Sequence, residues 1–159
     1  MDNSTYIHIL MDTLNKKNIL LEKLLDITSL QENYINDHIP DMDLFEQTLS
    51  EKENYINQIN QLDVGFEKIY GYVKEELSAK RIEYREYIEN LQELIRQITD
   101  KSAKMQASEL RNKLKMEAYL LSKKKEIKNF KINSKTASNY YKNMNNQQVL
   151  GSYFLDKKK

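Results

Sequence analysis

The sequence predicts an all-α protein: an elongated antiparallel helical hairpin or three-helix coiled-coil bundle with a partly ordered basic C-terminal tail. Three observations lead to this prediction. One proline and three glycines interrupt 159 residues, so the chain has few of the residues that build turns between strands. Apolar residues recur every three or four positions over most of the chain, which is the period of a helix. With 40% apolar and 31% charged residues, the composition is that of a folded protein.

The first predicted helix covers residues 4–36 and follows Asn3 and Ser4, which are favourable helix N-caps. Its stripe steps by three and four residues and consists of Ile7, Leu10, Leu14, Lys17, Leu21, Leu24, Thr28, Gln31 and Ile35. Such a stripe predicts an amphipathic helix that packs one face against a neighbour. Asp37 and Pro40 end this helix, because a residue before proline disfavours helical geometry.

The second predicted helix has its start signal at Asp43, which Glu46 follows with the spacing of a capping box. Its stripe consists of Phe45, Leu49, Lys52, Ile56, Ile59, Asp63, Phe66, Tyr70, Val73 and Leu77. The same rhythm continues without a slip through Arg81, Tyr84, Ile88, Leu91, Ile95, Ile98, Ser102 and Met105. The pattern therefore predicts helix over this whole stretch and does not by itself mark a break.

Residues 42–130 form either one very long helix or two helices, 42–77 and 81–130. The second alternative needs a turn near residues 76–82, although that segment contains neither glycine nor proline. A single helix would leave half of its apolar seam without a partner in the chain, because the first helix is too short to cover it. This argument favours the turn and a long-helix bundle over residues 1–130.

Beyond Met105 the apolar pattern has two faces. One face contains Ala107, Leu110, Leu114, Ala118 and Leu121, and the second contains Met116, Leu120, Ile127 and Phe130. A core within the chain needs only one of them, so the second is either the edge of a wide core stripe or the wall of a partner-binding groove. The candidate partner-binding residues are Leu110, Leu114, Met116, Tyr119, Leu120, Leu121, Ile127, Phe130, Tyr140, Tyr141 and Met144.

Charge is distributed unevenly along the chain. Residues 1–100 contain 20 acidic and 10 basic residues, whereas residues 101–159 contain 15 basic and 4 acidic ones. Either the basic part folds back on the acidic helices, or it binds an acidic partner. Residues 131–159 lose clear periodicity and are expected to form a basic aromatic tail, partly disordered or containing a short helix.

No catalytic, cofactor-binding or metal-binding constellation is evident, so the sequence does not predict an enzyme. The chain has no cysteine, which excludes disulfides and thiolate sites, and its two histidines are thirty residues apart. A lysine-rich stretch follows residue 123, but arginine is scarce there and the acidic remainder would repel phosphates, so nucleic acid is not the expected partner. No segment is apolar enough to span a membrane, and a cytoplasmic location is expected.

A first helix with paired leucines is followed by five characteristic segments, residues 41–46, 51–53, 94–101, 111–112 and 140–142. With these features the chain resembles, over residues 5–145, the FlgN family of flagellar export chaperones, whose members include proteins labelled FliT-like. The resemblance implies a cytosolic chaperone with no catalytic residues. It would bind the amphipathic C-terminal region of the hook-associated proteins FlgK and FlgL at the hook–filament junction and pass them to the export gate protein FlhA.

Two alternatives remain open at this point. The client is instead the filament cap protein, as for FliT-like chaperones, or the protein is a cargo-free coiled-coil scaffold or dimerisation module. A homodimer is compatible with each of these functions. A helix that docks in an apolar groove is the mode of recognition that fits residues 110–130.

Overall fold

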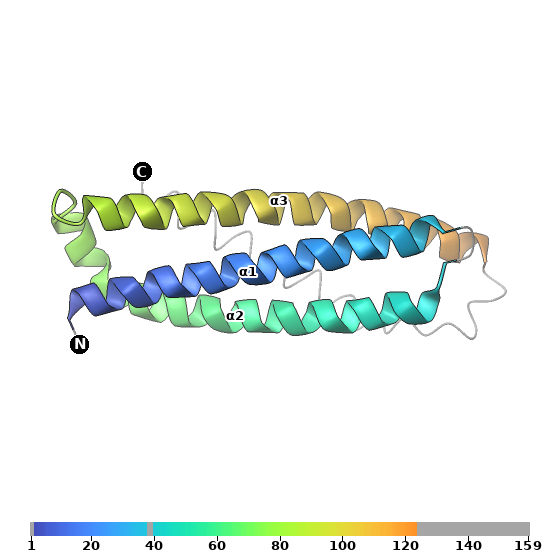
Figure 1. Ribbon diagram of the computed structural model, residues 1–159, viewed down its shortest axis with the longest axis horizontal. Coiled ribbons are helices and arrows are strands. Elements are labelled where there is room, and N and C mark those ends of the chain that lie inside the picture. Colours follow the sequence, from blue (N-terminus) through green and yellow to red (C-terminus); the bar gives the residue numbers. More distant parts are fainter. Residues whose placement is uncertain (1, 38–39, 124–159) are drawn as a thin grey trace.

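The computed structural model of the protein describes residues 2–37 and 40–123. These residues form three long helices, α1 (Asn3–Asn36), α2 (Met42–Ala79) and α3 (Arg85–Ser122), and contain no strand. Figure 1 shows the helices side by side, with α1 antiparallel to α2 and running in the same direction as α3. The predicted all-α helical bundle is confirmed.

The central helix of the bundle is α1, which packs along both α2 and α3. With 34 residues, α1 is about 51 Å long, and α2 and α3, with 38 residues each, are about 57 Å long. The helix α1 therefore covers the inward faces of both α2 and α3, which are only slightly longer than α1. That arrangement gives the long apolar seam of residues 45–105 a partner within the chain.

Asp2 caps the N-terminus of α1. Its carboxylate accepts hydrogen bonds from the backbone N–H and the hydroxyl of Thr5, both at 2.9 Å. Asn3 and Ser4, expected to precede the helix, lie inside its first turn. The cap is therefore one residue earlier than predicted. A capping side chain accepts from an N–H group two or three residues ahead, and Asp2 reaches that of Thr5.

Asp41 caps α2 in the same way, since its carboxylate accepts a hydrogen bond from the backbone N–H of Leu44 at 3.1 Å. The prediction that Asp43 begins this helix as part of a capping box with Glu46 is wrong. Asp43 lies in the first helical turn, where its negative charge is favourable beside the positive end of the helix dipole.

A turn at residues 80–84 separates α2 from α3, slightly later than the predicted 76–82. The backbone N–H of Lys80 donates to the Glu76 carbonyl at 2.9 Å, and that of Tyr84 donates to the Lys80 carbonyl at 3.1 Å. The turn is thus made of helix-like hydrogen bonds. No described residue has a positive φ, so this reversal does not need glycine.

The predicted stripes form the core. All positions of the α1 stripe are buried, and the stripe of α2 is buried except at the half-buried Asp63, Phe66 and Tyr70. The main core cluster consists of Ile7, Leu10, Leu14, Leu20, Leu21, Leu24, Ile56, Ile59, Val73, Leu77, Ile88, Leu91, Ile95, Ile98 and Met105.

A second, smaller cluster lies where α1 ends and α2 begins. It consists of Ile35, Phe45, Leu49 and Met116, with Met42, Tyr119 and Leu120 packed against it. Buried polar side chains lie between the two clusters along all three helices. This polar layer consists of Thr28, Gln31, Thr48, Lys52, Glu109 and Asn112, each at most 5% exposed.

Across residues 2–37 and 40–123, the structure has no helix with the length and apolar character needed to cross a membrane. The end of the predicted third helix, up to residue 130, and the predicted tail, residues 131–159, lie outside the described residues.

Candidate partner-binding site

The outer surface of α3 carries a continuous apolar stripe. Leu110 and Leu114 are each 57% exposed, and Leu121 is 71% exposed. Exposed alanines extend the line with the same three- and four-residue steps, so that the outer stripe consists of Ala103, Ala107, Leu110, Leu114, Ala118 and Leu121. At the helical rise it is about 27 Å long. Other exposed apolar side chains, such as Ile19, Val64 and Ile82, lie elsewhere on the surface.

The opposite face of the same segment belongs to the core. Met105, Glu109, Asn112 and Met116 are buried, and Leu120 is half-buried against the second cluster. Met116 and Leu120 thus belong to the core, as in the alternative that assigned them to a wide core stripe, whereas Leu110 and its neighbours form the exposed face.

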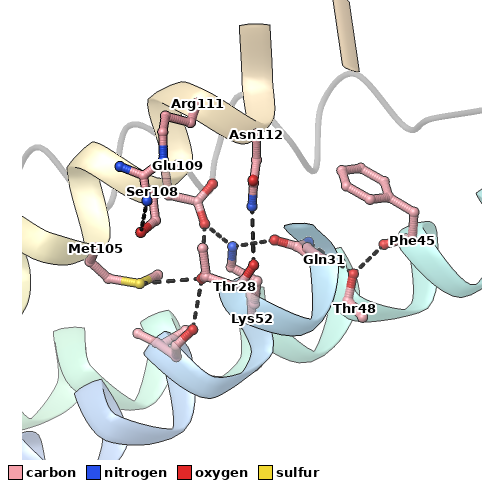
Figure 2. A network of polar contacts seen from close by, with 11 residues as sticks. Thr28, Gln31, Phe45, Thr48, Lys52, Met105, Ser108, Glu109, Arg111 and Asn112 are labelled. Atoms are coloured by element: carbon pink, nitrogen blue, oxygen red, sulfur yellow. Dashed lines mark hydrogen bonds and ion pairs between the residues drawn. The ribbon is translucent and has the colours of Figure 1, made fainter. Parts of the chain in front are cut away.

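The rotation of α3 about its axis follows from the polar layer. Each residue of a helix is rotated by about 100° from the one before, so a helix that points Glu109 and Asn112 inward must point Leu110 and Leu114 outward. The ammonium group of Lys52 on α2 forms an ion pair with the carboxylate of Glu109 on α3. Figure 2 shows these side chains pointing toward one another between the helices.

Side chains of α1 complete the polar layer. Lys52 donates to Gln31 Oε1 at 2.6 Å, and Gln31 Nε2 donates to the Thr48 hydroxyl at 2.8 Å. The Thr28 hydroxyl donates to the Leu24 carbonyl at 2.7 Å and lies 3.2 Å from Glu109 Oε1.

Asn112 makes a further link between α3 and α1, since its Nδ2 donates to the backbone carbonyl of Thr28 at 3.1 Å. Interactions from all three helices thus determine which face of α3 is buried (Figure 2). Buried polar groups without partners are costly, so another rotation of α3 is disfavoured.

Lys52 is fully buried, and burial lowers its pKa well below the usual value because desolvation disfavours the ammonium form. The Glu109 carboxylate opposes this effect by stabilising the positive charge. Such a pair adds little net stability compared with apolar side chains of the same volume. Removing only one of the two partners, however, strongly destabilises the fold, because the other charge is left buried alone. Its contribution here is to the register and rotation of the helices.

The two flanks of the outer stripe are charged, and mostly basic. Lys104, Arg111 and Lys115 follow one flank, at helical spacings of seven and four residues. Lys113 and Glu117 lie on the other flank, with their charged atoms 4.0 Å apart. All five side chains are exposed, although Lys115 also reaches α1, where its ammonium lies 3.5 Å from Glu32. The stripe is therefore an apolar surface with basic margins.

The remaining candidate residues are placed only in part. Tyr119 is half-buried against the second cluster, together with Leu120. Ile127, Phe130, Tyr140, Tyr141 and Met144 lie outside the described residues. Of the predicted partner-binding residues, the structure thus places Leu110, Leu114 and Leu121 together on one exposed face.

Sequence reasoning missed Glu109 and Asn112. The signal that could have found them is the core rhythm itself, which continues from Met105 in steps of four, three and four through Glu109 and Asn112 to Met116. The apolar residues do not follow that rhythm: Leu110 lies one position after Glu109, and Leu114 lies two positions after Asn112. Because the sequence analysis followed apolar residues instead of the established period, it left Glu109 and Asn112 out of the predicted core.

Within the described ranges, no group of three or more histidine, cysteine or acidic residues is arranged to hold a metal ion. Comparisons of the chain with models of known protein families, with curated proteins and with solved structures find no match. The resemblance to FlgN-family chaperones therefore has only the residues quoted above as its support.

Proposed function

We propose that this protein is a chaperone that binds an amphipathic helix of a client protein along the outer stripe of α3. The client is the C-terminal region of a flagellar hook-associated protein, as the FlgN-family resemblance implies, and the chaperone acts in the cytoplasm and delivers it to the export gate protein FlhA. The observation that supports this proposal is the exposed stripe on the face of α3 opposite to its core.

A bundle of three helices gains nothing from leucines on that face. Leu110, Leu114 and Leu121 expose most of their surface, and they belong to the outer stripe, which is about 27 Å long. A client helix of about 18 residues would cover this line and bury its own apolar face at the same time. Shielding such a face before export prevents premature association of the client, which is what an export chaperone does.

Calorimetric titration of the full chain with isolated C-terminal segments of hook-associated proteins tests the proposal. The variant Leu110→Ser/Leu114→Ser should bind about 30- to 150-fold more weakly, because burying the exposed parts of two leucines contributes about 2–3 kcal/mol. The matched control is Ile19→Ser/Val64→Ser, which changes two comparably exposed side chains on α1 and α2. We expect the control to bind as the unmodified chain does.

The other outcomes favour defined alternatives. Binding of the filament cap protein alone would favour the FliT-like function. A full chain that binds no client would contradict the chaperone proposal and favour the scaffold alternative, in which the outer stripe pairs with a second copy. Client binding that is unchanged by Leu110→Ser/Leu114→Ser would show that the client uses another surface.

A further inference from the structure

The charges beside the outer stripe distinguish this surface from the rest of the molecule. Among residues 103–123 the exposed charged side chains are five basic residues and one acidic one, since Glu109 is buried against Lys52. Residues 1–100, by contrast, carry twice as many acidic as basic residues. The one long apolar line on α3 thus lies within a locally basic surface of a mostly acidic bundle.

From this juxtaposition we infer that the partner of the outer stripe is an amphipathic helix of another protein whose apolar seam is bordered by acidic residues. This inference rests on the proposed function and specifies the chemistry of the client. Acidic side chains of the partner would meet Lys104, Arg111 and Lys115 along one margin of the seam. Opposite charges across an interface increase the association rate and exclude partners of the wrong charge.

The same charges disfavour the two other occupants of the stripe. A second copy of the chain that pairs α3 with α3 would bring an equally basic margin against this one. The segment 124–159 of the chain itself carries nine lysines and two acidic residues, so its charge also has the wrong sign. Like charges brought together at an interface oppose binding, so neither of these occupants matches the margin.

Three synthetic peptides of about 20 residues test the inference, each long enough to cover the stripe as a helix. They share one apolar seam and differ only in having glutamate, glutamine or lysine at the flanking positions. Binding to the full chain is measured by fluorescence anisotropy. The glutamate peptide should bind about 3- to 100-fold more tightly than the glutamine peptide, because each of the three exposed pairs contributes a factor of about 1.5 to 5. The lysine peptide should bind most weakly.

Charge reversal on the protein provides the decisive comparison. In the variant Lys104→Glu/Arg111→Glu the order of the three peptides should reverse, so that the lysine peptide binds most tightly. The matched control, Lys68→Glu/Lys74→Glu, makes the same change in net charge at exposed positions of α2 and should keep the original order. The preference for glutamate should also weaken as salt rises from about 0.1 M to about 1 M, because the Debye screening length falls from roughly 10 Å to 3 Å.

The outcomes separate this inference from the proposed function. If hook-associated segments bind the chain but the three peptides bind equally well, the inference fails while the chaperone proposal stands. If neither peptides nor segments bind, both fail. If sedimentation shows a dimer that Leu114→Glu dissociates, a second copy occupies the stripe and the inference is overturned.

Discussion

Glu109→Met removes the carboxylate that contacts the buried ammonium of Lys52 and leaves that ammonium inside the bundle. Lys52 is 0% and Glu109 4% exposed, so water does not replace the lost partner. Removing one member of a buried ion pair costs about 3–5 kcal/mol. This is a large part of the 5–15 kcal/mol by which a typical domain is stable. Denaturant unfolding followed by far-ultraviolet circular dichroism should therefore show a much lower midpoint for this variant.

The double variant Lys52→Met/Glu109→Met is the control that isolates the pair. Methionine is unbranched and adaptable, so it can fill the space of either side chain without a charge. Replacing a whole buried pair by apolar residues is often neutral or stabilising, so the double variant should be more stable than Glu109→Met. We expect a coupling free energy on the order of 3 kcal/mol. A double variant whose loss equals the sum of the two single losses would refute this view of the polar layer.

The pH dependence of Glu109→Met gives a second test of the same pair. Burial lowers the pKa of Lys52 in the folded state below its ordinary 10.5, so the unfolded chain binds more protons between those two values. The free energy of unfolding therefore rises with pH in this window. Without the carboxylate the pKa of folded Lys52 falls further, so the deficit of Glu109→Met should shrink as the pH rises from this lower folded-state pKa to that of the unmodified chain. A deficit that stays constant would mean that Lys52 is not desolvated as described.

Two further predictions concern stability. Gly65→Ala and Gly71→Ala should each raise the free energy of unfolding by about 0.4–1 kcal/mol in denaturant titrations. Both glycines are inside α2, neither has a positive φ, and an added Cβ meets nothing within 4 Å. A loss of stability would contradict the packing seen around α2. Leu120→Ser should cost about 1–2 kcal/mol because it removes half-buried contacts with the second cluster, whereas Leu121→Ser should stay within about 0.5 kcal/mol. Equal losses for these two neighbours would place the inner face of α3 elsewhere.

Much of the fold was predictable because the apolar stripes of α1 and α2 follow the helical period closely. Even the polar members of those stripes, such as Lys17, Lys52 and Gln31, occupy the positions that spacing predicts, and all three are buried. The position of the turn was harder to predict from the sequence. Its helix-like hydrogen bonds at Lys80 and Tyr84 form without a positive φ, so no glycine or proline marks it.

The inner face of α3 was not predictable from apolar periodicity. Glu109 is buried because Lys52 and Thr28 meet it, and these partners are 57 and 81 residues away in the chain. The core rhythm from Met105 points to position 109, but it does not identify the distant partners that make the burial of a carboxylate possible. The exposed leucines, by contrast, look like core residues in sequence, and only the arrangement of three helices shows that they face outward.

Site-specific photo-crosslinking tests the proposed client-binding surface most directly. A photoactivatable phenylalanine derivative replaces Ala118, in the outer stripe, or Val64, which is 70% exposed on α2. Each full-length variant is mixed with a hook-associated C-terminal segment, irradiated and analysed by mass spectrometry. We expect a covalent adduct with the apolar seam of the segment from position 118 and none from position 64. Adducts from position 64 alone, or equally from both, would contradict binding along the outer face of α3.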